Sequence, residues 1–104
     1  MVKVVEVHNE YAERMGRVRS AISNVPKGYE VALDNCGWAN YNIYRKGRVF
    51  SHRIGWILIP NCNPDWGKRD VRITLKYAQD LEAVKLIAEQ IEKADFDVTI
   101  EVQA

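Results

Sequence analysis

The chain has few of the residues that mark secreted or metal-binding domains. Its two cysteines, Cys36 and Cys62, form no Cys-x-x-Cys pair, so two reduced thiols are expected in a reducing compartment. A disulfide between them is the alternative interpretation, because intracellular disulfides occur in hyperthermophiles. The usage of Val, Ile, Glu and Lys is compatible with a thermophilic source.

Long apolar runs are also missing. The longest strongly apolar run, residues 57–59, ends at Pro60 and is far too short to cross a bilayer. Glu6 and His8 lie where a signal peptide would need an apolar core. No stretch is rich in Gly, Ser or Pro, and no segment repeats. We therefore expect a cytoplasmic protein with no membrane partner, folded as a single domain over residues 1–104.

The sequence also contains no specific motif for catalysis, metal binding or cofactor binding. His8, His52 and the cysteines lack the closely spaced ligand pair of structural zinc sites. Either cysteine could be a nucleophile with His52 as its base, but only the fold could bring these residues together, and the sequence does not reveal that. Asp34, Asp65 and Asp70 could gather around Mg²⁺ to cleave a phosphodiester, but aspartate there is also typical of turns and caps. We expect no cofactor and no metal, and a binding protein rather than an enzyme.

Apolar periodicity predicts two helices and six strands. Helices are expected over residues 10–23, where Asn9 is the N-cap, and over about 81–94, where Asp80 is the cap. Leu86 lies opposite the apolar stripe of the second helix and should be exposed. Strands are expected over residues 2–7, 29–33, 40–45, 48–59, 70–77 and 96–102, with a turn at 46–47 and a bulge or bend at Gly55.

The element order β-α-β-β-β-β-α-β predicts an α+β fold. Each helix has a single apolar stripe, which suits a two-layer sandwich: a mostly antiparallel sheet of five to six strands with both helices on one face. A ferredoxin-like core with an inserted hairpin fits this order. The face under the helices should carry Val71, Ile73, Leu75, Val98 and Ile100. The open face should carry Arg72, Thr74, Lys76, Asp97, Thr99 and Glu101.

Charge is distributed unevenly along the chain. Residues 43–72 contain seven Lys or Arg against two Asp, a local net charge of +5, whereas residues 73–104 carry −4 and residues 1–42 are neutral. Six of the ten Phe, Tyr and Trp residues lie within residues 38–66. Cations contact phosphates and aromatic rings stack on unpaired bases, so this composition is typical of proteins that bind single-stranded nucleic acid.

We therefore predict a small non-enzymatic protein that binds single-stranded DNA or RNA through the hairpin and loop of residues 38–72. The expected contacts are Tyr41, Tyr44, Arg45, Lys46, Arg48, Arg53, Trp56, Trp66, Lys68 and Arg69. The same residues also suit a simpler interpretation, in which aromatics favour strands and basic side chains protect an exposed hairpin edge from aggregation.

Two alternative functions stay open. An exposed hairpin edge over residues 40–59, together with Leu86, would suit a protein-interaction or homo-oligomerisation module, and we expect a homodimer. A small metal-dependent nuclease is the second alternative.

Overall fold

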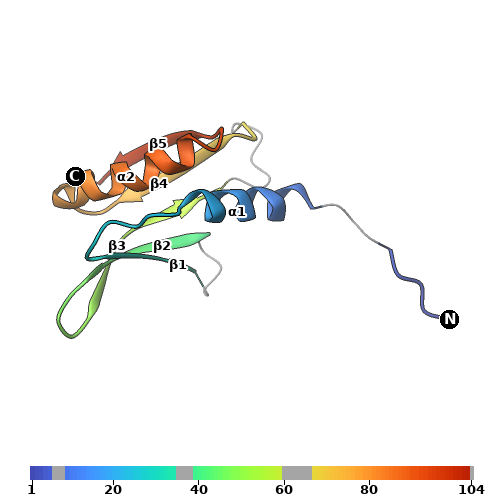
Figure 1. Ribbon diagram of the computed structural model, residues 1–104, viewed down its shortest axis with the longest axis horizontal. Coiled ribbons are helices and arrows are strands. Elements are labelled where there is room, and N and C mark those ends of the chain that lie inside the picture. The colour runs from blue at the N-terminus through green and yellow to red at the C-terminus, as the bar shows by residue number, and fades with distance from the viewer. Residues whose placement is uncertain (6–8, 35–38, 60–66, 104) are drawn as a thin grey trace.

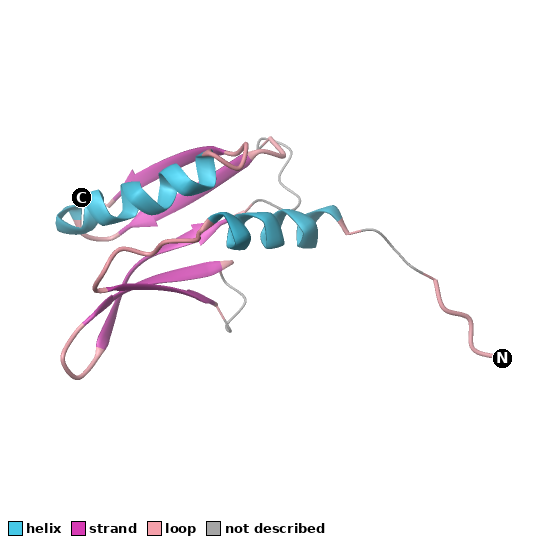
Figure 2. Ribbon diagram, in the orientation of Figure 1, coloured by secondary structure: helices cyan, strands magenta, loops and turns pink. Residues whose placement is uncertain are grey.

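The computed structural model describes residues 1–5, 9–34, 39–59 and 67–103. Predictions about His8, Cys36, Cys62, Asp65 and Trp66 lie outside these residues. The helices are α1 (Glu10–Ala21), α2 (Leu81–Glu92) and the short 3-10 helix η1 (Ala78–Asp80). The strands are β1 (Tyr29–Leu33), β2 (Tyr41–Lys46), β3 (Ser51–Leu58), β4 (Asp70–Leu75) and β5 (Asp97–Val102). Figure 2 shows how these helices and strands are arranged.

The strands form one five-stranded sheet in chain order, β1-β2-β3-β4-β5 (Figure 1). Pairing is antiparallel from β1 to β4, whereas β4 and β5 run parallel and are joined through α2. The predicted α+β class and mostly antiparallel sheet are therefore confirmed. A ferredoxin-like core is not confirmed, because β4 and β5 are direct neighbours and a split β-α-β unit would place another strand between them.

Both helices pack on the same face of this sheet. Val18 of α1 and Ile91 of α2 belong to one buried cluster with Ile43 and Ile73 of the strands. Burial alternates along β4, so the period-2 prediction of a covered and an open face is confirmed there. On α2 the predicted exposure of Leu86 is also confirmed, at 52%.

Two strand predictions are wrong. Residues 2–5 form no strand, because no described strand pairs with them, and β propensity depends on such packing. Residues 6–7 lie outside the described part. The β2–β3 hairpin is not an edge, because β1 pairs with β2 and β4 pairs with β3. Among the strands that the structure describes, β1 and β5 are the two edges of the sheet.

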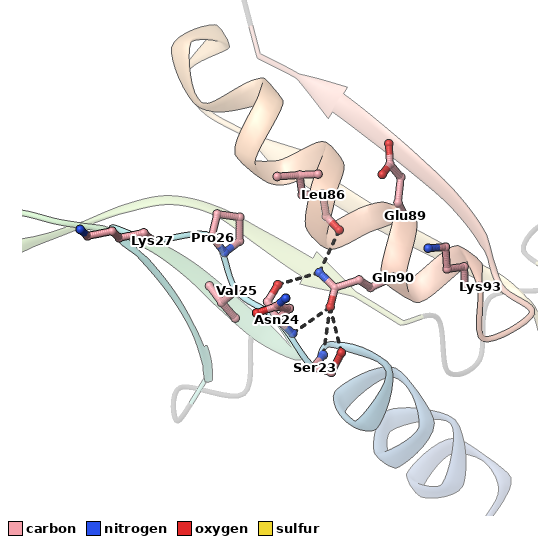
Figure 3. Close-up of a pocket in the computed structure, with 9 residues that line it drawn as sticks. All are labelled: Ser23, Asn24, Val25, Pro26, Lys27, Leu86, Glu89, Gln90 and Lys93. Atoms are coloured by element: carbon pink, nitrogen blue, oxygen red, sulfur yellow. Dashed lines mark hydrogen bonds between the residues drawn. The ribbon is translucent and has the colours of Figure 1, made fainter.

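Gln90 of α2 holds the connection between α1 and β1 in place (Figure 3). Its amide oxygen accepts from the backbone N–H groups of Ser23 and Asn24 at 3.0 and 2.9 Å, and its amide nitrogen donates to the carbonyl oxygen of Asn24 at 2.7 Å. Nearby, Arg17 of α1 donates to the carbonyl oxygen of Ala94 at 2.8 Å. These contacts fix α1 against α2 over the sheet.

Candidate nucleic-acid interface

The sheet face opposite the helices gathers aromatic, basic and polar side chains on its central strands. Register pairs Tyr44 with Arg53, and Trp56 with both Asn42 and Thr74. Paired residues project to the same face of a sheet. Because Thr74 lies on the open face of β4, these side chains lie there too.

A β-bulge places Arg53 and Trp56 on this shared face. In a regular strand, residues three positions apart point to opposite faces. The register between β2 and β3 shifts between Ile43 and Tyr44, which leaves Ile54 as the extra residue of β3. Ile54 is fully buried in the core cluster. The bulge or bend predicted at Gly55 is thus a bulge at the neighbouring Ile54, and it changes which β3 side chains meet.

Arg53 lies over the indole of Trp56, with its Cζ atom 4.5 Å from the ring centroid. Its Nε donates to Oδ1 of Asn42 at 2.8 Å. The Asn42 amide in turn lies 3.5 Å from the Tyr44 hydroxyl, which accepts its hydrogen bond. Arg53 is therefore held over an aromatic ring by contacts from two strands, and both Arg53 and Trp56 are partly exposed.

Tyr41 and Arg45 lie on the helix side of the sheet, as the alternation along β2 requires. Tyr41 is buried in the core cluster and donates its hydroxyl to the carbonyl oxygen of Met15 at 3.1 Å. It is not accessible to a ligand on the open face.

Arg45 forms an ion pair with the buried carboxylate of Asp80. Its Nη1 lies 3.0 and 2.9 Å from the two carboxylate oxygens of Asp80, whose side chain is 1% exposed. The Tyr29 hydroxyl donates to the same carboxylate at 2.6 Å, and this hydrogen bond raises the pKa of Tyr29 above its usual value. Asp80 occupies the N-cap position of α2, but its side chain makes no capping bond. The prediction that Asp80 caps the helix is wrong, because the carboxylate is committed to Arg45 and Tyr29.

Lys46 and Arg48 are exposed at the β2–β3 turn. The predicted two-residue turn is instead a longer one, in which the N–H of Gly47 donates to the carbonyl oxygen of Phe50 at 3.0 Å and β3 begins at Ser51. Phe50 is 75% exposed at this turn. The turn therefore presents basic and apolar groups together.

Lys68 and Arg69 lie at the opposite end of the sheet from this turn, because they precede β4 and β4 runs antiparallel to β3. Arg69 pairs with Asp95 at 2.8 Å, and Lys68 lies 3.5 Å from Glu10. With side chains of α1 they line an open cavity of about 340 Å³. The structure thus divides the predicted contacts among the open face, the turn, the core and the far end of the sheet.

The other candidate sites have structural explanations. A cavity of about 450 Å³ lies between residues 23–27 and α2, but the amide of Gln90 inside it is already bonded to the backbone (Figure 3). Asp34 and Asp70 bind the N–H groups of Ala39 and Gly67, which is a turn role. In the part of the chain that the structure describes, no three His, Cys, Asp or Glu residues are grouped so that they could hold a metal.

Comparisons with protein-family models, curated proteins and solved structures find no match to this chain. Its function is therefore inferred from the geometry of the open face. Among the described residues, no helix combines the length and apolar character needed to cross a membrane.

Proposed function

We propose that the protein binds single-stranded nucleic acid on the open face of its sheet, centred on Arg53 and Trp56. The observation that carries the proposal is the guanidinium of Arg53 lying over the Trp56 ring on a face that neither α1 nor α2 covers. Unpaired bases stack on aromatic rings and on arginine planes, and the same arginine contributes charge toward phosphate. Tyr44, which is paired with Arg53 across the strands, adds a second ring.

The charges around this centre support a path for a phosphate backbone. Arg72 lies on the open face of the neighbouring strand β4, and Lys76 follows it in the same alternation. Lys46 and Arg48 extend the positive charge to the β2–β3 turn. On the other side, β5 carries Asp97 and Glu101, so an anionic strand would be confined to β2, β3 and β4.

A binding assay with labelled oligo-dT and oligo-U tests the proposal. We expect affinity to fall between about 50 and 200 mM salt, with a log–log slope near −0.7 for each phosphate contact. Trp56→Ala should weaken binding by roughly 1–3 kcal/mol, about 5- to 150-fold, and leave the slope nearly unchanged. Arg72→Ala should flatten the slope by a fraction of a unit. Comparing the two oligonucleotides separates DNA from RNA preference.

Lys85→Ala is the matched control, because Lys85 is an exposed lysine of α2, on the helix side of the molecule. It should leave affinity within about twofold of the parent. Arg53→Lys keeps the charge but removes the planar group. It should therefore weaken binding with little change in the salt slope, as Trp56→Ala does, and not flatten the slope as Arg72→Ala does. The proposal is refuted if neither oligonucleotide binds at low salt, or if Trp56→Ala and Lys85→Ala have the same effect.

A further inference from the structure

The first residues of the chain have the pattern of a strand without a partner. In an extended chain Val2 and Val4 project to one side, and Lys3 and Val5 project to the other. One side of this segment therefore carries only valine. Val2 and Val4 are each 88% exposed, and this segment extends away from the sheet (Figure 1). β-branched residues are stabilised in strands by packing on neighbouring strands. Three exposed valines within four residues therefore indicate a surface that another strand or sheet covers.

The outer edge of β5 offers the complementary surface. No strand of the described chain pairs with this edge. On the helix side, Val98 and Ile100 are only partly buried and Val102 is 42% exposed, whereas Ile73 of the next strand is fully buried. The apolar layer beneath the helices is thus incomplete at β5. An additional strand would extend it and would pair the exposed main-chain groups of the edge.

We propose that residues 2–5 of one chain add as a strand to the outer edge of β5 in a second copy, so that two chains exchange these segments. Val2 and Val4 would then continue the apolar layer of β5, because alternate side chains of an added strand share a face. Lys3 would fall on the open side, where β5 carries Asp97 and Glu101.

Charge favours β5 over the other edge of the sheet. Residues 1–5 contain one lysine and no acidic residue. β5 carries two acidic side chains, whereas β1 carries only Glu30. Opposite charges on neighbouring strands stabilise the pairing. The proposed contact uses none of the residues assigned to nucleic-acid binding, so either proposal can fail without the other.

Light scattering of the full chain over a range of concentrations tests this contact. We expect twice the chain mass of 12.0 kDa at high concentration. Val4→Lys, which places a charge in the apolar layer, should yield a monomer. Val102→Lys should do the same from the other side of the contact. Val49→Lys is the matched control, because Val49 is 81% exposed at the β2–β3 turn, and this variant should remain dimeric.

Hydrogen exchange then locates the edge. The β5 amides that do not bond to β4 should be protected in the dimer and should exchange at least tenfold faster in Val4→Lys. A monomer at every concentration would overturn the proposal, as would a dimer that survives Val4→Lys. Protection that appears at β1 instead of β5, or that persists at β5 in a monomer, would also overturn it. Far-UV circular dichroism should be the same for all variants on the exposed residues 2–5.

Discussion

At the scale of single residues, Arg45 and Asp80 form an ion pair whose two members differ in access to water. The side chain of Asp80 is 1% exposed, whereas that of Arg45 is 32% exposed. Arg45→Gln leaves a buried carboxylate without its cation, and we expect it to lower the free energy of unfolding by about 3–5 kcal/mol. Asp80→Asn should have a smaller effect, because water can solvate the guanidinium. Urea denaturation measures both.

Arg48→Gln is the control for this pair, because Arg48 is exposed at the turn. It should change stability by less than about 0.5 kcal/mol. Equal losses for Arg45→Gln and Asp80→Asn would contradict the argument. Since Arg45→Gln destabilises the fold, a loss of nucleic-acid binding in that variant would not identify Arg45 as a contact.

Tyr29 makes stability depend on pH in the alkaline range. The hydrogen bond to Asp80 raises the pKa of Tyr29 above 10.0, so the folded protein keeps the phenol protonated after the unfolded chain has lost the proton. This contribution is full below about pH 10 and is lost as pH rises through the higher pKa of the folded state. In Tyr29→Phe, unfolding measured across this range should show a shallower decline.

Some decline should persist in Tyr29→Phe, because burial also raises the pKa of Tyr41. Identical pH profiles for the two proteins would contradict the assignment to Tyr29.

This cluster also shows the limit of local sequence patterns. Asp80 before an apolar stripe is typical of a helix cap, and Arg45 beside Lys46 is typical of a basic surface. Their pairing joins residues 35 positions apart, and Tyr29 is a further 16 positions before Arg45. No periodicity within either segment encodes that contact.

At the scale of elements, Gly55 permits the close approach of β3 and β4. A Cβ atom at Gly55 would collide with the backbone carbonyl oxygen of Thr74, which cannot move without disturbing β4. We therefore expect Gly55→Ala to destabilise the protein by about 1–3 kcal/mol.

Gly16→Ala is the paired variant for this test. Gly16 lies inside α1 and has open space around it, so alanine should stabilise the helix by about 0.5–1 kcal/mol. Thermal unfolding should thus shift in opposite directions for the two substitutions. A shift in the same direction for both would contradict the role given to the β3–β4 approach.

Periodicity predicted the helices and the alternation of β4 and β5 because each segment carries its own apolar face. The prediction that Asn9 caps α1 was also correct, since its Oδ1 accepts a hydrogen bond from the N–H of Ala12 at 3.1 Å. The predictions that failed concern which strands and side chains contact one another. The valines of residues 2–5 have the composition of a strand, but composition does not supply a neighbour. Similarly, the sequence indicated a bulge or bend at Gly55 but not that the bulge at Ile54 would bring Arg53 beside Trp56.

At the scale of the whole molecule, the order of strands in the sheet was the feature that sequence could not determine. The β-α-β-β-β-β-α-β pattern suits several arrangements, and the ferredoxin-like one needs a strand between two parallel neighbours. Here the chain instead adds each strand beside the previous one. This order puts the predicted hairpin in the interior of the sheet and leaves β1 and β5 as edges. The hairpin is thus paired on both sides within the sheet, and its edge is not a surface for self-association.

The same strand order has a consequence for how the chain folds. Each strand pairs with the strand that precedes it in the chain, so the sheet can grow from β1 while the chain is being synthesised, although β5 reaches β4 only after α2. The contacts of α1 and of the connection after it span two ranges. Tyr41 of β2 meets Met15 across 26 residues, whereas Gln90 meets Asn24 across 66 and Arg17 meets Ala94 across 77. α1 can therefore dock on β2 before α2 is made, whereas the contact of Arg17 with Ala94 forms only after α2. Until α2 is made, the apolar cluster between α1 and the sheet is only partly covered, and apolar surface exposed at that stage favours aggregation of the nascent chain.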